Sequence, residues 1–133
     1  MNIVLTIDVG HPPRQHHTVE SELDEKLLKV RNSPSICIIK TIHGRSGATK
    51  ETVRNRAYNK RNRLRGIIYG ENYTIFDEWT QEMRDEAGQF PDADLEASNS
   101  GITILWVKWI PAWCFIFYFY IFIFNFFTAI YSF

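Results

Sequence analysis

Short apolar runs alternate with polar stretches along the chain, and their spacing separates strands from helices. Four runs are rich in β-branched residues and typical of buried strands. These predicted strands cover residues 2–9, 36–39, 64–69 and 101–107. Three stretches between them repeat apolar residues at helical spacing, with polar residues on the opposite side. The predicted helices cover residues 18–30, a stretch that starts near residue 48, and residues 73–87.

The order of these elements, β-α-β-α-β-(α)-β, is typical of an α/β domain. Alternating strands and helices favour right-handed crossovers and a parallel core of the sheet. In the last helix, Trp79 and Met83 are predicted core residues. No internal repeat is present.

Charge is unevenly distributed, although the whole chain has a formal net charge of zero. The basic segment, residues 40–66, holds nine lysines and arginines against one glutamate, a net charge of +8. The acidic segment, residues 71–96, holds nine acidic residues against one arginine, a net charge of −8. A basic surface attracts phosphate with an affinity that falls as salt rises. The pattern equally fits a solvated basic face that pairs with the acidic segment.

Two cysteines, Cys37 in a predicted strand and Cys114 near the C-terminus, belong to no CxxC or Cys/His metal pattern. We interpret both as reduced structural thiols. The first ten residues, MNIVLTIDVG, lack the basic start and long apolar run of a secretory signal. These features predict an intracellular protein, cytoplasmic or nuclear.

The last 25 or so residues form an apolar tail. Residues 109–133 contain no charged residue, and 15 of the 22 residues in 112–133 are Phe, Ile or Tyr. By length and apolarity this tail is a candidate transmembrane anchor that would leave the rest of the chain facing the cytosol. Leu and Gly are absent from it, and AT-rich non-coding DNA translates into the same composition. We therefore predict a domain over residues 1–108, followed by a tail that is either a membrane anchor or a gene-model artefact.

The turn after the second predicted strand has the features of an anion site. Residues 43–47, His-Gly-Arg-Ser-Gly, lie between this strand and the start of the next helix. The glycines Gly44 and Gly47 can adopt positive φ and let a ligand approach the backbone. Free N–H groups and the helix dipole favour an anion at a helix start. Basic side chains extend the predicted binding surface; they are Arg45, Lys50, Arg54, Arg61, Arg63 and Arg65.

Three motifs resemble those of the small MutS-related (Smr) domain family. Residues 7–11, Ile-Asp-Val-Gly-His, resemble the family's Leu-Asp-Leu-His-Gly at the end of strand one, with Gly and His in reversed order. Residues 43–47 resemble its His-Gly-x-Gly motif, with the second glycine one place later. Residues 101–104, Gly-Ile-Thr-Ile, resemble its late Gly-x-Thr strand. The stretch 2–108 looks like a variant branch in which strand one ends in Asp-Val-Gly.

The resemblance implies an α+β sandwich with a β-α-β-α-β-β core, a mixed four-stranded sheet and DNA or RNA as partner. Some members of the family nick DNA, and others cut or bind RNA. The resemblance therefore implies either an endonuclease that acts on phosphodiesters or a nucleic-acid-binding module without catalysis. No small-molecule cofactor is expected.

Asp8, His11 and His43 are the candidate catalytic residues, because all three follow strands whose carboxyl ends should meet at one edge. A histidine could act as general acid or base on a phosphodiester. A carboxylate beside it could orient the imidazole, or hold Mg²⁺ or Mn²⁺ together with the substrate phosphate. No metal site formed by the protein alone is predicted, since the pair His16-His17 lacks a third ligand. Asp8 as a turn cap and His43 as a hydrogen-bonded turn residue remain open alternatives.

Two further classes of protein remain open. One is a membrane-tethered interaction protein, with the membrane as partner only if the tail is genuine. The other is a nucleotide-binding α/β domain, which the absence of GxGxxG and GxxxxGK[ST] spacing disfavours.

Overall fold

The structure, a computed structural model, describes residues 3–33, 35–45, 47–108 and 112–131, with side chains of the last helix described over 119–128. Four strands, four helices and two short 3₁₀ turns follow one another within these ranges. In chain order they are β1 (Val4–Asp8), α1 (His16–Arg31), β2 (Ile38–Ile42), α2 (Ala48–Asn59), η1 (Arg61–Arg63), β3 (Leu64–Tyr69), η2 (Gly70–Asn72), α3 (Glu78–Ala87), β4 (Ile102–Val107) and α4 (Ala112–Tyr131).

The four strands form one mixed sheet in the order β1-β2-β4-β3. Strands β1 and β2 pair in parallel, and β4 pairs antiparallel with both β2 and β3. The predicted fold class, an α/β sandwich around a mixed four-stranded sheet, is confirmed. The predicted parallel core is wrong beyond the β1–β2 pair, because β4 lies between β2 and β3.

Burial explains why β4 takes a central place. All six of its residues, ITILWV, are buried, so both of its faces must be covered. The outer strand β1 instead exposes Thr6 and Asp8, as an edge strand with one neighbour can.

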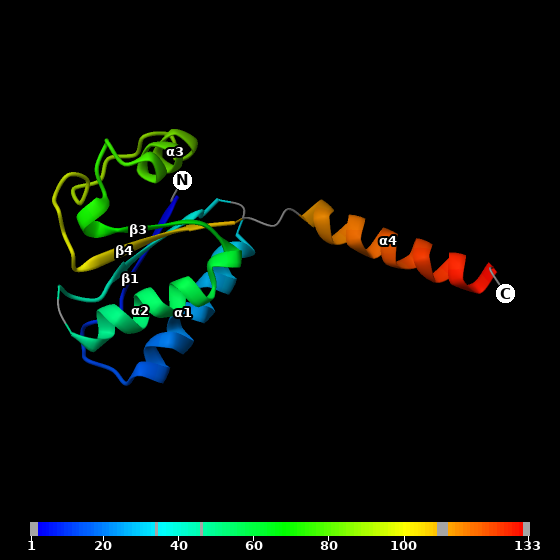
Figure 1. Ribbon diagram of the computed structural model, residues 1–133, viewed down its shortest axis with the longest axis horizontal. Coiled ribbons are helices and arrows are strands. Elements are labelled where there is room, and N and C mark those ends of the chain that lie inside the picture. The colour runs from blue at the N-terminus through cyan, green and yellow to red at the C-terminus, as the bar shows by residue number, and fades with distance from the viewer. Residues whose placement is uncertain (1–2, 34, 46, 109–111, 132–133) are drawn as a thin grey trace.

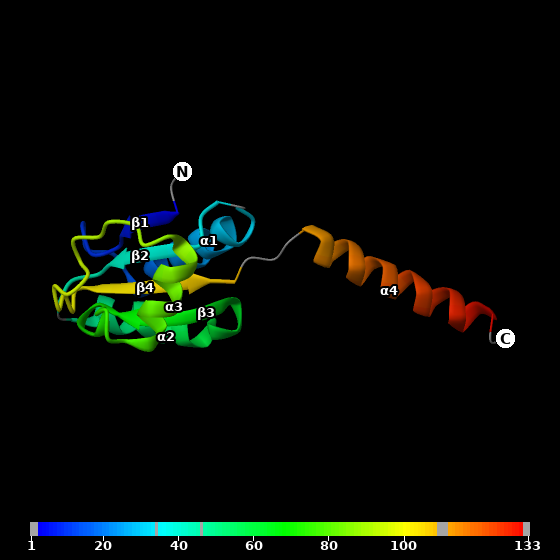
Figure 2. The same ribbon diagram turned by 90° about the horizontal axis from the view of Figure 1, so that it is seen from above.

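Two apolar layers enclose the sheet, and Figures 1 and 2 show helices α1 and α2 on one face and α3 on the other. Alternation along each strand sends odd-numbered residues of β1, β2 and β4 toward α1 and α2. That core includes Ile7, Val19, Leu23, Leu27, Ile39, Val53, Leu105 and Val107. The core under α3 includes Ile38, Ile68, Tyr73, Met83, Ile104 and Trp106.

The helix boundaries follow local capping. Helix α1 begins at His16, two residues before the predicted start, with Gln15 as an N-cap that makes no side-chain hydrogen bond. Helix α3 begins at Glu78, since the carboxylate of Asp77 accepts the N–H of Thr80 at 2.9 Å. The helix predicted from residue 73 is therefore shorter.

Of the two predicted core residues in α3, Met83 is fully buried, whereas Trp79 is 49 % exposed. Trp79 packs edge-on against Trp106, with ring centroids 6.5 Å apart. Its ring covers Gly66, where a Cβ would lie 3.0 Å from it. Placing Trp79 in the core was wrong.

The tail forms helix α4, which lies apart from the sheet and its helices in both views. Its described side chains, from Phe119 to Thr128, are almost all exposed. A search of the residues that the structure describes finds no helix long and apolar enough to cross a membrane. The boundary at residue 108 remains a prediction.

Candidate functional site

Asp8, His11, His43 and the glycine turn after His43 lie at one edge of the sheet, the edge where β1, β2 and β3 end and β4 begins. We call it the carboxyl edge. The turns into α1 and α2 also start there, so both helix N-termini lie at this edge. The topology therefore brings together the three motifs that are far apart in sequence.

Asp8 caps the turn after β1. Its Oδ1 accepts the N–H groups of Gly10 and His11, each at 3.0 Å. The Nδ1 of His11 lies 3.6 Å from the same oxygen, and the side chains of His11 and Asp8 are 79 % and 44 % exposed. This carboxylate thus has the predicted capping role and also faces an accessible imidazole.

The first and second motifs touch through their backbones. Val9 N–H donates to Ile42 O at 2.9 Å. A Cβ at Gly10 would lie 3.1 Å from the carbonyl carbon and oxygen of His43, tighter than an ordinary contact. The reversed Gly-His order therefore suits this chain, because any larger residue at position 10 would require the backbone of His43 to shift.

His43 is buried within this edge, with 3 % of its surface exposed. Its Nδ1 lies 2.8 Å from Gly44 O, and its Nε2 lies 2.8 Å from Thr103 Oγ1. Since a carbonyl only accepts, Nδ1 carries the proton and Nε2 accepts from the Thr103 hydroxyl. Burial lowers the pKa of His43, against the opposing effect of its bond to Gly44 O, and nearby Arg54 and Lys50 lower it further. The imidazole is therefore neutral at neutral pH.

Thr103 connects His43 to Arg54. The Nε of Arg54 donates to Thr103 Oγ1 at 3.1 Å, while Nη1 and Nη2 donate to the two carboxylate oxygens of Glu71 at 2.9 and 2.8 Å. The guanidinium lies over the Tyr69 ring, 3.9 Å from its centroid. Only 13 % of the Arg54 side chain is exposed. Arg54 is thus held inside the carboxyl edge and is not part of a solvated basic face.

The turn into α2 presents an open helix start. Gly44 and Gly47 have φ of +93° and +103°, and Ser46 lies outside the described residues. The N–H groups of His43 and Gly44 donate to Gly101 O at 2.9 and 3.1 Å, so the open part of the turn begins after Gly44. A Cβ at Gly47 would meet nothing within 4 Å, and Gly47 provides no side-chain cap for α2. The first N–H groups of α2 have no intrahelical acceptor, and the space beside Gly47 is open.

Four cations of the basic segment form ion pairs. They are Lys40 with Asp92 and Asp94, Arg54 with Glu71, Arg56 with Glu20 and Asp24, and Arg65 with Glu86. Three of the four draw their partners from the acidic segment. For these three residues, the structure agrees with the interpretation that the basic segment pairs with the acidic segment. Arg54 and Arg65, both predicted to bind nucleic acid, are among them.

Five cations of the basic segment have no acidic partner among the residues that the structure describes. They are Arg45, Lys50, Lys60, Arg61 and Arg63. Arg45 and Lys50 flank the start of α2, whereas the other three follow its end. A helix of 12 residues separates the two groups by about 18 Å. The predicted binding residues Arg61 and Arg63 therefore do not join Gly44, Arg45, Gly47 and Lys50 in one site.

Local sequence pattern did not identify several residues of this edge. Tyr69 ends β3 and Glu71 follows it, and their contacts with Arg54 depend on β4 lying between β2 and β3. His16 Nδ1 lies 2.5 Å from Thr52 Oγ1, which links the starts of α1 and α2. Thr103 could have been suspected, because it belongs to the Gly-x-Thr motif.

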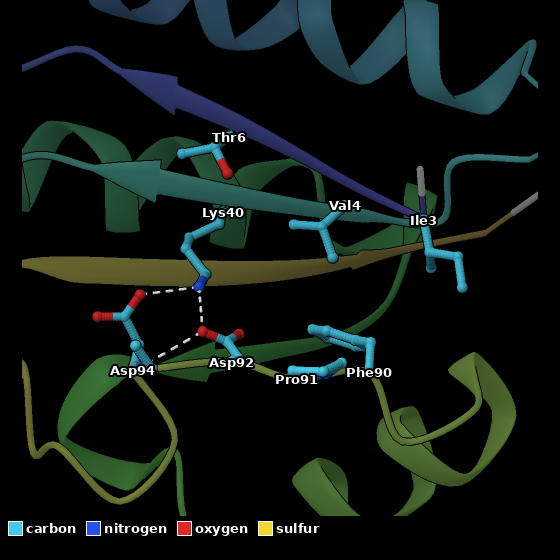
Figure 3. Close-up of a pocket in the computed structure, with 9 residues that line it drawn as sticks. Ile3, Val4, Thr6, Lys40, Phe90, Pro91, Asp92 and Asp94 are labelled. Atoms are coloured by element: carbon cyan, nitrogen blue, oxygen red, sulfur yellow. Dashed lines mark hydrogen bonds and ion pairs between the residues drawn. The ribbon is translucent and has the colours of Figure 1, made fainter. Parts of the chain in front are cut away.

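A cavity of about 420 Å³ lies elsewhere, between β1, β2 and residues 90–94 on the α3 face (Figure 3). Lys40 reaches across it to the carboxylates of Asp92 and Asp94. Tyr73 OH donates to Asp92 Oδ2 at 3.0 Å, and burial raises the pKa of Tyr73 to about 12. Lys40 and the two aspartates thus form ion pairs with one another. No predicted site residue lines this cavity.

Within the described ranges, no three His, Cys, Asp or Glu side chains lie close enough together to hold a metal ion. Asp8 offers one carboxylate, already engaged by two N–H groups. The described residues at the carboxyl edge thus do not form a metal site by themselves.

No family model matches the chain, and no curated protein matches it in sequence. Among solved structures, the chain is similar to the crystal structure of the Smr domain of Thermus thermophilus MutS2. The two share 14 % sequence identity with a TM-score of 0.49, over 77 % of this chain and 96 % of that one.

Proposed function

We propose that this chain is a nucleic-acid-binding domain of the Smr-like type, which holds the phosphate backbone of DNA or RNA at the start of α2. One observation carries the proposal. The N-terminus of α2 is open at Gly47 and is flanked by Arg45 and Lys50, two cations that form no ion pair among the described residues. Backbone N–H groups, the helix dipole and two positive charges together favour a phosphate group.

The convergence of the three motifs supports the same location. Gly10 packs on His43, and the N–H groups of His43 and Gly44 donate to Gly101 O. Thr103 completes the contact through the His43 ring. Each motif that resembles the Smr family thus contributes to holding one turn, the turn that would face the phosphate.

In this proposal His43 positions the turn. Both ring nitrogens are hydrogen-bonded, and burial keeps the ring neutral. A buried imidazole engaged on both sides is poorly placed to exchange a proton with a substrate.

Cleavage of the phosphodiester is the second candidate function, and the exposed pair of His11 and Asp8 favours it. Asp8 Oδ1 lies 3.6 Å from Nδ1 of His11, so it could orient the ring and leave Nε2 to take a proton from the attacking hydroxyl or water. In this reaction the attacking oxygen forms a bond to phosphorus, and the ester oxygen leaves.

The test uses the full chain with labelled plasmid, duplex DNA, single-stranded DNA and RNA, with and without Mg²⁺ or Mn²⁺. We expect gel shifts that weaken as salt rises. Nicked plasmid or cut RNA would establish cleavage as well, and loss of cutting in His11→Ala with binding retained would assign it to His11.

A matched pair of double variants locates the surface. Arg45→Gln with Lys50→Gln removes two charges at the start of α2, and Lys60→Gln with Arg61→Gln removes two at its end. The first should weaken binding to all sequences and lower the slope of log K against log salt by about 2, about 1 for each lost phosphate contact. Equal losses from both pairs, or a greater loss from the second, would contradict the proposed surface.

A further inference from the structure

The guanidinium of Arg54 is held from three sides. Its Nε donates to Thr103 Oγ1 at 3.1 Å, its Nη2 lies 3.5 Å from Ile102 O, and its flat face lies on the ring of Tyr69. Strands β3 and β4 supply all three contacts. The remaining edge, formed by Nη1 and Nη2, therefore points in one fixed direction.

Glu71 occupies that remaining edge. Its two carboxylate oxygens accept from Nη1 and Nη2 at 2.9 and 2.8 Å. The Glu71 side chain is 36 % exposed and covers the less exposed Arg54 from the solvent side. The bond to Arg54 lowers the pKa of Glu71, so the carboxylate stays charged at neutral pH.

The backbone at Gly70 is tightly packed, whereas the side chain of Glu71 is partly exposed. A Cβ at Gly70 would lie 1.8 Å from Asn99 O and 2.5 Å from the Ile102 side chain, so the η2 turn packs tightly on the start of β4. A rotation of the Glu71 side chain alone would uncover the guanidinium. The three contacts that hold Arg54 would remain.

We propose that Arg54 is a second phosphate-binding position at the carboxyl edge, and that Glu71 blocks it in the free protein until a phosphodiester group displaces the carboxylate. This inference rests on the proposed function. It adds that the carboxylate of Glu71 competes with phosphate for the guanidinium of Arg54. Carboxylate and phosphate oxygens both fit the two parallel N–H donors of a guanidinium. Because Thr103 also holds His43, the Arg54 position is joined to the phosphate-binding turn through one hydroxyl.

The Arg65–Glu86 pair provides the matched control. It also joins an arginine of the basic segment to a glutamate of the acidic segment, and it is more exposed, at 42 % and 53 % for the two side chains. Arg65 lies over Trp106, near the end of β4 and away from the carboxyl edge. Glu86→Gln therefore removes the same charge as Glu71→Gln without uncovering a position at the site.

The experiment measures the affinity of the full chain for labelled single-stranded RNA and duplex DNA over a range of salt. Glu71→Gln and Glu71→Ala should bind at least several-fold more tightly than the unchanged chain, with a salt slope larger by about 1. Glu86→Gln should change affinity and slope much less. Arg54→Lys in the Glu71→Gln background should remove most of the gain, because lysine keeps the charge but lacks the paired donors.

A direct readout comes from the Arg54 Nε–H resonance in ¹⁵N NMR spectra. On titration with the oligonucleotide it should shift in the unchanged chain, and at lower oligonucleotide concentration in Glu71→Gln. Thermal unfolding of each variant identifies any change that comes from loss of fold.

The outcomes separate the two proposals. If the unchanged chain binds and Glu71→Gln behaves like Glu86→Gln, the inference is wrong and the proposed function stands. If neither the unchanged chain nor Glu71→Gln binds any nucleic acid, both are wrong. If Glu71→Gln binds nucleic acid and the unchanged chain does not, the result would support the inference that Glu71 blocks Arg54, and would mean that this block prevents binding completely.

Discussion

The hydroxyl of Thr103 donates a 2.8 Å hydrogen bond to Nε2 of His43, 60 residues earlier in the chain. It also accepts from Arg54 Nε, so one oxygen joins β4, α2 and the turn between β2 and α2. Thr41 is the cross-strand partner of Thr103, and its buried hydroxyl has no hydrogen-bond partner among the described residues. Of these two neighbouring threonines on one face of the sheet, Thr103 has a hydroxyl that forms hydrogen bonds, and Thr41 has a hydroxyl that forms none with the described residues.

We expect Thr103→Val to lower the free energy of unfolding by about 1–3 kcal/mol, because it leaves buried nitrogens of His43 and Arg54 without a partner. Thr41→Val removes a hydroxyl that makes no bond and should be neutral or slightly stabilising. Urea unfolding of both variants measures the difference. Equal losses in the two would mean that the Thr103 hydroxyl does not hold the site together.

The pKa of His43, lowered mainly by burial, predicts a pH dependence of stability. The unfolded chain takes up a proton at this residue more readily than the folded protein does. The stability that comes from neutral His43 is therefore complete above the unfolded value of about 6.5 and declines as pH falls below it. His43→Gln should reduce the change in unfolding free energy between about pH 8 and about pH 5.5. The exposed His17, changed to Gln, serves as the control and should leave that change intact.

Gly47→Ala tests whether the open space at the start of α2 receives a ligand. Gly47 and Gly88 both have positive φ, +103° and +85°, and a Cβ at either would meet nothing within 4 Å. Alanine at either position should cost about 1–3 kcal/mol, with the greater strain at Gly47, whose ψ of −179° lies in a region that only glycine commonly adopts, whereas Gly88, with ψ of 26°, is in the left-handed region. Only Gly47→Ala should also weaken nucleic-acid binding, measured under conditions where both variants are folded. If Gly88→Ala weakens binding equally, the effect comes from lost stability. Gly44 is less suitable, because its N–H is bonded to Gly101 O.

We expect residues 1–108 to fold without the apolar tail. Strand β4 ends at Val107, and the N–H of Lys108 makes a final backbone bond to Arg63 O at 3.0 Å. Urea denaturation of this segment should be cooperative, with a midpoint close to that of the same transition in the full chain. A soluble segment without a cooperative transition would show that the boundary is misplaced.

Local pattern was enough to predict most elements of the fold. Strand β3 was predicted at its observed bounds, because Leu64–Tyr69 is a short apolar run between polar stretches. The place of β4 was not predicted: its five apolar residues among six indicate burial on both faces but do not identify its neighbours. Strand order depends on contacts between distant segments.

The candidate site was predicted in location more than in role. Motif positions placed Asp8, His43 and Gly101 at strand ends, and these ends do meet. A signal for the burial of His43 was present, since Ile39, Thr41 and His43 share one face by alternation and Ile39 is a core residue. The pairing of Arg54 with Glu71 had no such signal, because net charge along a segment does not say which side chains face each other.

The central position of β4 also affects the order in which the chain can fold during synthesis. Strands β2 and β3 are both paired to β4 and not to each other. A nascent chain that ends before Ile102 therefore has two hydrogen-bonding strand edges without a partner, and such edges favour pairing with other chains. The sheet closes only when the last strand of the domain has been made, so folding of this domain has to await nearly all of its sequence.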